Sequence, residues 1–319
     1  MAVWFSKQAR HNFASTGAFW PTIRLCSRGM QSLPQPQTPE PLVEGCPVVE
    51  LYDDPRDIEN ILRVLYDPVL FISPKQSSFA MVVSLVRMGR KYEFDKLWIV
   101  GLLVLLEAGI PMTLAEYDGL RDASYELGFT DKHPGLYIDI LNLLREHNIL
   151  AFLPSVYYIV IQKYSVQQLF DGVPRGDGTT AVLTTQDLRQ CMLSRDKIRR
   201  AQFQPGYALS WLSPTPLDTI GGAPSCLAFR SRNMPAYATT SALCLLDPEL
   251  SDNVHKMLRR NGLCSTCCDE ARAVQKAGRQ KGWEDLPSFF DLAPWSELAF
   301  ELKIIMGGPR EEGMEWDFL

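Results

Sequence analysis

Apolar side chains recur at helical spacing in the first third of the chain. In the segment 55–66 they stand at positions 58, 61, 62, 65 and 66, and five polar or charged residues lie on the other face. Spacings of three and four residues put the apolar side chains on one face of a helix. Similar patterns predict helices over 77–92 and 94–108, and Gly109 and Pro111 supply the expected end of the last. A β-branched run at 47–52 predicts a strand before them.

Helical patterns continue in the second half of the chain. One of these helices begins after Thr184 or Thr185, and either threonine suits the N-cap position. Residues 203–247 lack periodicity and are rich in Pro and Gly, so we expect long irregular structure there. The fold class predicted from these patterns is α+β, predominantly α-helical, with a flexible tail over 307–319. The predicted helices cover 135–147, 151–164, 186–201, 250–260, 265–281 and 295–306.

The first 44 residues differ from the rest of the chain. The first thirty contain four basic residues, and the first acidic residue is Glu40. This composition occurs in organelle transit peptides. It is also the composition of a terminus without fixed structure, and we favour this second interpretation. Four prolines within 33–41 exclude a helix interior or a central strand. We therefore predict a divergent N-terminal segment followed by a Pro-rich linker over 1–44.

The overall composition is that of an ordinary globular protein. Hydrophobic residues make up 46% of the chain, charged residues 22%, and the net charge is -5. A mildly acidic chain has no basic footprint for nucleic acid. Its longest apolar run, 97–106, reaches about half of the distance across a bilayer. Since the start has no signal-peptide pattern, we expect an intracellular protein, cytoplasmic or nuclear, with mitochondrial import as the less favoured alternative.

The sequence lacks the motifs of the common enzyme classes. It has no nucleophile elbow, zinc-protease, phosphate-loop or dinucleotide fingerprint. His147 follows Glu146, but its place at a predicted helix end favours an interaction with the helix dipole over catalysis. We therefore expect no catalytic residue, no small-molecule substrate and no cofactor apart from the zinc considered next.

Cysteines supply the sharpest local signal for chemistry. The chain has eight, and three of them fall within five positions, where Cys264 and Cys267 form a C-x-x-C pair. Two thiolates at this spacing can both reach one tetrahedral Zn²⁺. Cys226, Cys244 and His255 are candidates for the remaining ligands. Partly buried thiols at a helix N-terminus are the favoured alternative, and a redox pair is a third that lacks a thioredoxin-like context.

The stretch from Glu44 to Leu106 carries a recognisable combination of residues. It contains EGCPVVELYDDPRDIENILRVLYDP and SFAMVVSLVRMGRKYEFDKL, in which an acidic turn, Leu65-Tyr66 and Lys91-Tyr92 stand out. This combination resembles the second half of a BTB/POZ domain. Further on, REHNILAFLPSVYY, FDGVPRGDGTTAVLTTQDLRQCML and KGWEDLPSFFDLAPWSEL resemble a large group of mushroom-type (basidiomycete) fungal BTB proteins with a Cys-containing C-terminal extension. Residues 1–25 do not match the strand-rich section with which that family begins.

The resemblance implies a partial BTB/POZ-like fold of helices on a small sheet over 45–130, followed by a helical extension over 131–306. It also implies a non-catalytic protein–protein interaction module that acts as a scaffold or adaptor. A substrate adaptor of a cullin-type ubiquitin ligase is one alternative, and a zinc-stabilised regulatory protein is another. The expected partners are proteins, through self-association or a cullin, and neither nucleic acid nor membranes.

Overall fold

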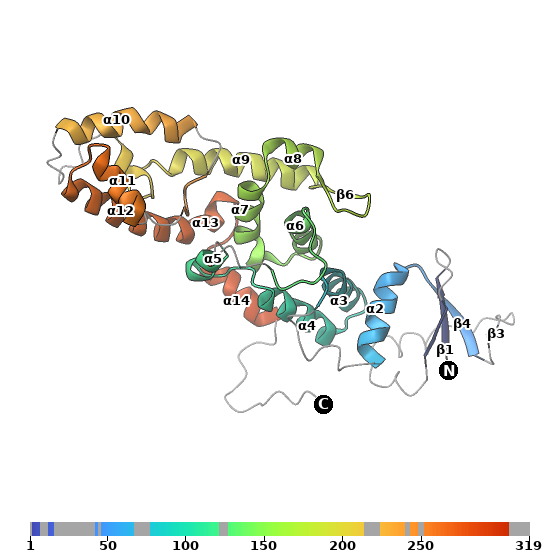
Figure 1. Cartoon of the computed structure of the whole chain (residues 1–319). Coiled ribbons are helices and arrows are strands. Elements are labelled where there is room, and N and C mark those ends of the chain that lie inside the picture. Colours follow the sequence, from blue (N-terminus) through green and yellow to red (C-terminus); the bar gives the residue numbers. More distant parts are fainter. Residues whose placement is uncertain are drawn as a thin grey trace, which may run out of the picture. The chain divides into compact units, whose positions relative to one another are not determined.

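The computed structural model describes residues 2–6, 12–15, 42–43, 46–66, 77–120, 127–213, 224–239, 243–247 and 252–305. The described residues are predominantly helical, as the sequence predicts (Figure 1). The chain divides into two compact units. Unit 1 comprises residues 1–110 and 126–132, and unit 2 comprises 111–125 and 133–319. The expected tail 307–319 lies outside the described residues.

The sheet of unit 1 includes strands that the sequence pattern does not reveal. Its four strands are β1 (Ala2–Ser6), β2 (Asn12–Ser15), β3 (Leu42–Val43) and β4 (Cys46–Leu51), in the order β2-β1-β4-β3. Strand β1 pairs antiparallel with β2 and parallel with β4. The expectation of a terminus without fixed structure is therefore wrong for 2–6 and 12–15. The reason is that strand pairing between distant segments leaves little trace in either segment alone.

Three consecutive helices complete unit 1. They are α2 (Pro55–Tyr66), α3 (Phe79–Lys91) and α4 (Asp95–Glu107), so all three helix predictions are confirmed to within two residues. Helices α3 and α4 approach closely at Gly89, where a Cβ atom would lie 2.7 Å from the Trp98 backbone nitrogen. The six buried residues of the core between α2, α3 and α4 are Ile58, Ile61, Val64, Leu85, Met88 and Leu97.

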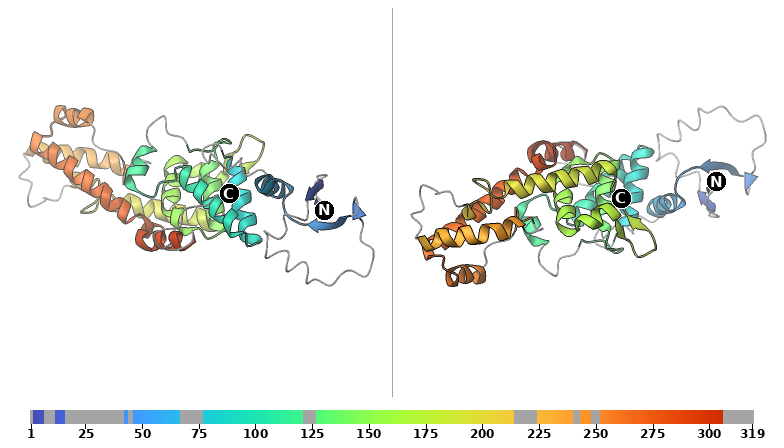
Figure 2. Two further views of the ribbon diagram at one scale, coloured as in Figure 1. Left: turned by 90° about the horizontal axis from the view of Figure 1, so that it is seen from below. Right: turned by 90° about the horizontal axis from the view of Figure 1, so that it is seen from above.

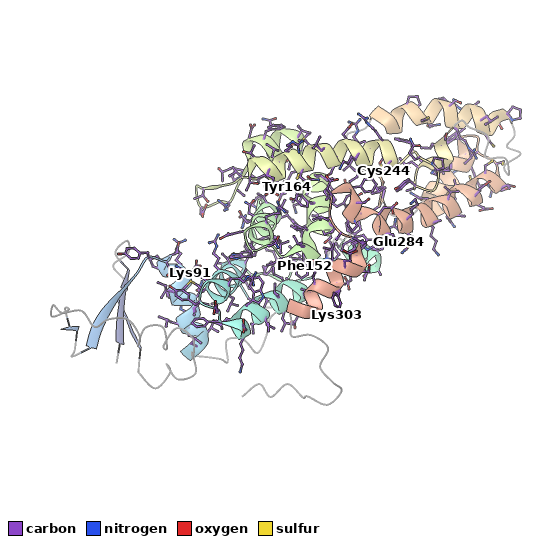
Figure 3. All side chains as sticks on the ribbon, turned by 180° about the vertical axis from the view of Figure 1, so that it is seen from behind. Lys91, Phe152, Tyr164, Cys244, Glu284 and Lys303 are labelled. Carbon is purple, nitrogen blue, oxygen red and sulfur yellow. The ribbon has the colours of Figure 1, made fainter. Side chains whose placement is uncertain are left out.

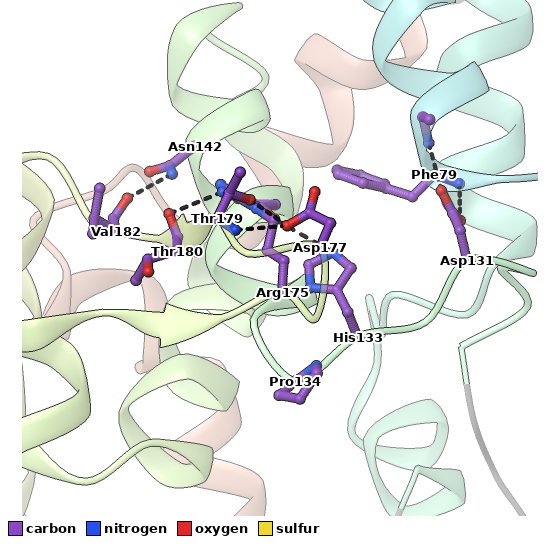
Figure 4. A network of polar contacts seen from close by, with 12 residues as sticks. Phe79, Asp131, His133, Pro134, Asn142, Arg175, Asp177, Thr179, Thr180 and Val182 are labelled. Atoms are coloured by element: carbon purple, nitrogen blue, oxygen red, sulfur yellow. Dashed lines mark hydrogen bonds and ion pairs between the residues drawn. The ribbon is translucent and has the colours of Figure 1, made fainter.

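A segment from beyond α4 returns to cap the start of α3. The Asp131 carboxylate accepts hydrogen bonds from the backbone N–H groups of Phe79 at 2.5 Å and Ala80 at 3.0 Å (Figure 4). Ser78 accepts a third from Met81 at 3.1 Å. A carboxylate at this end satisfies N–H groups that have no partner within the helix and is favoured by the helix dipole. These contacts explain why residues 126–132 belong to unit 1.

The described part of unit 2 consists of helices and one short hairpin. Its central helix, α7, is buried at every position from Leu153 to Ile161. Figures 1 and 2 show α10, α11 and α12 together at one end of unit 2 and α6, α7 and α8 towards the other. In Figure 3, Phe152 and Tyr164 lie in the part built by α6 and α7, and Cys244 lies in the part built by α10 to α12. The elements are α5 (Leu114–Gly119), α6 (Leu136–Glu146), η4 (Leu150–Phe152), α7 (Leu153–Lys163), α8 (Val166–Asp171), β5 (Val173–Pro174), β6 (Thr180–Ala181), α9 (Thr185–Ala201), η5 (Ser210–Leu212), α10 (Pro224–Thr239), α11 (Asp252–Arg260), α12 (Ser265–Glu284), α13 (Leu286–Phe289) and α14 (Trp295–Ile305).

The expectation of irregular structure over the whole of 203–247 is wrong, because α10 occupies Pro224–Thr239. Pro224 opens the helix, where its missing N–H costs nothing. Pro235 lies inside the helix, where a proline is normally unfavourable. Buried residues at 226, 229 and 230 nevertheless form a stripe at helical spacing, so tertiary packing outweighs the local signal.

The glycine-rich turn after α8 is a hairpin held by one arginine. Its strands β5 and β6 pair antiparallel. The Arg175 guanidinium binds both carboxylate oxygens of Asp139 in α6, at 2.6 and 2.7 Å, and donates to Thr179 at 3.1 Å (Figure 4). Asp177 accepts the backbone N–H of Thr179 at 2.9 Å. The hairpin is thereby tied to α6.

Within the described segments, every helix is too short or too polar to reach across a bilayer. The expected domain limits at 45, 130 and 306 stay predictions.

Candidate functional site

Two of the three features that carry the BTB resemblance in unit 1, the acidic turn and Lys91-Tyr92, meet in one contact. Asp53, in the acidic turn after β4, accepts a hydrogen bond from the Tyr92 hydroxyl at 2.5 Å and forms an ion pair with Lys91. Lys91 and Tyr92 end α3, so this contact, the Asp53 clasp, joins the turn before α2 to the end of α3. Asp53, Lys91 and Tyr92 therefore have a role in the packing of unit 1.

A second polar link joins the same two helices. The hydroxyl of Ser84 in α3 donates to Asp57 in α2 at 2.7 Å, and the Asn60 amide donates to the Ser84 oxygen at 2.9 Å. Burial raises the pKa of the Asp57 carboxyl, while the Ser84 hydrogen bond and Arg87 oppose this effect. Both links serve the packing of α2 on α3.

The buried carboxylate of Asp187, in unit 2, is held by three neighbouring side chains. Asp187 in α9 accepts hydrogen bonds from the Tyr157 hydroxyl and, at 2.5 Å, from the Thr184 hydroxyl. Arg145 approaches it at 3.0 Å. The pKa of Tyr157 is raised well above its ordinary value, first by burial and then by Asp187. A tyrosine held neutral in this way is poorly suited to proton transfer near pH 7.

Three cysteines from two segments, the starts of α10 and α12, come together in unit 2. Cys226 lies in the first turn of α10, Cys264 caps the start of α12, and Cys267 lies in the first turn of α12. Their sulfur atoms all lie within 4.8 Å of one another. Cys226 and Cys267 are buried, and Cys264 is exposed. The structure thus brings together the predicted C-x-x-C pair and one of the further candidate ligands.

Backbone N–H groups point at two of these sulfur atoms. Cys264 Sγ accepts the N–H of Cys267, and Cys226 Sγ accepts the N–H of Cys264, each at 3.4 Å. The first of these bonds lowers the pKa of the Cys264 thiol. The pKa of Cys267 is raised to about 12, first by burial and then by the neighbouring sulfur atoms. Three sulfur atoms at this spacing could either bind a soft metal ion or form a disulfide from one of their pairs.

The remaining candidate ligands differ in their placement. Cys244 is buried in the same apolar cluster, but its sulfur is not among the three that converge. Cys268, next to the pair, directs its thiol towards the Leu263 carbonyl oxygen at 3.9 Å. The side chain of His255, in α11, lies outside the described residues.

Arg230 is a buried cation of α10 that the sequence prediction did not include. Arg230 follows Cys226 by four positions in α10, and only 3% of its surface is exposed. Residues four apart lie on the same face of a helix, so this cation shares the buried face with Cys226. Its Nε atom has no hydrogen-bond partner within the described part of the chain. The helical period of 226, 229 and 230 is the signal that could have found it.

Comparisons with protein-family models, with curated proteins and with solved structures give no match for this chain. The BTB resemblance therefore rests on the residues quoted above.

Proposed function

We propose that this protein is a non-catalytic protein–protein interaction module of the BTB/POZ type that acts as a scaffold or adaptor. The observation that carries the proposal is the Asp53 clasp, because it brings together two features of the quoted combination, the acidic turn and Lys91-Tyr92. The order of elements in unit 1, four strands followed by three helices, is compatible with helices on a small sheet. The structural partners of Asp57 and Asp187 also favour a non-catalytic role.

Tyr52 offers a position from which to test the interaction. It directly precedes the Asp53 clasp, and 83% of its surface is exposed. Tyrosine is among the residues that most often dominate protein interfaces. A photo-crosslinking residue at 52 in the full chain should capture a defined protein partner in cells, either a second copy of this chain or a cullin. The matched control is the same label at Phe170 in unit 2, which is 60% exposed.

A purified complex then separates the two forms of the proposal. Co-purification of a cullin that is lost in a Tyr52→Ser variant, and retained in Phe170→Ser, supports the adaptor. Self-association lost in the same variant supports the scaffold. If position 52 crosslinks no more specifically than position 170, and the pure chain neither self-associates nor binds a cullin, the proposal fails.

A further inference from the structure

The cysteine cluster of unit 2 has the composition of a soft-metal site. Thiolates favour Zn²⁺ and Cu⁺ over Mg²⁺ or Ca²⁺, which take oxygen ligands. Zn–S bonds of about 2.3 Å in tetrahedral geometry put ligand sulfur atoms about 3.8 Å apart. The sulfur atoms of Cys226, Cys264 and Cys267 lie within 4.8 Å of one another. A change of roughly 1 Å, within reach of small side-chain rotations, therefore satisfies the geometry of zinc.

The polar surroundings of the cluster suit bound thiolates better than neutral thiols. Two sulfur atoms accept backbone N–H groups, and such outer hydrogen bonds hold metal ligands in place. Three thiolates and one Zn²⁺ carry a net charge of -1. Arg230 follows Cys226 by four positions in α10 and is buried, so one cation lies on the same face of that helix.

We propose that Cys226, Cys264 and Cys267 bind one Zn²⁺ ion that joins α10 to the start of α12. Binding releases three thiol protons to solvent, and the ion keeps its +2 state throughout, so no oxidant or reductant is needed. Tetrahedral coordination leaves one further position for a ligand beyond these three. The ion is structural: it connects two helices that are 38 residues apart in sequence at the ligands Cys226 and Cys264.

Cys264→Ser is the sharpest test of the site. Cys264 is the exposed N-cap of α12, and serine is among the preferred N-cap residues. The variant therefore removes a ligand but preserves the helix cap. The full-length chain, purified under reducing conditions with added zinc, should contain one zinc per chain by elemental analysis. In Cys264→Ser, zinc affinity measured by competition with a chromophoric chelator should fall at least about tenfold.

Two control variants distinguish ligand loss from damage to the fold. Cys268→Ser alters the neighbouring thiol, which faces the Leu263 carbonyl, and Cys191→Ser alters a buried thiol in α9. Both should retain full zinc content. Hydrogen exchange provides a readout that does not depend on metal content. Chelator should raise exchange in α10 and in the first turn of α12 of the unaltered chain, and the rise should be smaller in Cys264→Ser.

Three results would overturn the proposal. The first is a chain without zinc, or with copper instead, after zinc supplementation. The second is unchanged zinc affinity in Cys264→Ser. The third is a disulfide between any two of the three cysteines in protein whose thiols were alkylated at the moment of cell lysis, because an oxidised pair cannot supply two thiolates.

Discussion

Gly278→Ala tests the packing of α12 in unit 2. Gly278 lies inside α12 and is buried against the segment before η5. A Cβ atom at this position would lie 2.7 Å from the Ala208 Cα atom and closer still to the Ala208 nitrogen and the Tyr207 carbonyl carbon. All three are backbone atoms, so no side-chain rotation can relieve the overlap. Either α12 or the 207–208 segment has to move.

Two effects of opposite sign set the size of the change. Replacing glycine by alanine within a helix normally stabilises it by about 1 kcal/mol. Overpacking a tight contact typically costs about 1–3 kcal/mol, and backbone overlap belongs at the upper end of this range. Since the clash involves three backbone atoms, we expect it to prevail and to leave a net loss of about 1–2 kcal/mol in the free energy of unfolding.

Urea denaturation monitored by circular dichroism measures this loss. Ala277→Gly is the matched control, because Ala277 is the preceding residue of α12 and is exposed. It should lose about 1 kcal/mol through helix propensity alone. Gly278→Ala thus reverses the usual order, in which alanine is the more stable residue in a helix. An unfolding midpoint of Gly278→Ala equal to or above that of the unaltered chain would refute the close contact between α12 and residues 207–208.

Two further predictions concern carboxylates of unit 2. Asp187→Asn should lower the free energy of unfolding by about 1–3 kcal/mol, because buried donors lose an ionised acceptor. Asp196→Asn, at an exposed ion pair in the same helix, should change the free energy of unfolding by less than about 0.5 kcal/mol. Equal losses of the two variants in urea denaturation would contradict this prediction. Burial raises the pKa of Asp285, but hydrogen bonds from Lys281 and Tyr207 outweigh burial and hold that pKa below 3.8. The stability contributed by the carboxylate is therefore present above pH 3.8 and is lost as the pH falls through the lowered pKa of the folded state. The cost of Asp285→Asn should accordingly shrink below pH 3.8, and a cost independent of pH would argue against the bonds to Lys281 and Tyr207.

The helices were predictable because their signals are local. In α2 the apolar residues recur every three or four positions. Helix α9 begins after Thr184, whose side chain accepts a hydrogen bond from the Asp187 N–H and so caps the helix, as the sequence suggests. The C-x-x-C pair was likewise visible, because both cysteines belong to one helical turn. These features depend on residues within about two turns of one another, and such short-range patterns can be recognised in a single sequence.

What the tertiary structure decided depends on contacts between distant segments. Three features are of this kind: the pairing of β1 with β4, the choice of Cys226 over Cys244 as the third cysteine of the cluster, and the burial of Arg230. Helix α10 forms although Pro235 lies inside it and argues against it locally, because one of its faces is buried. Local pattern indicates which face of an element is apolar, but the partner of that face is selected by the packing of the whole unit, which no single segment encodes.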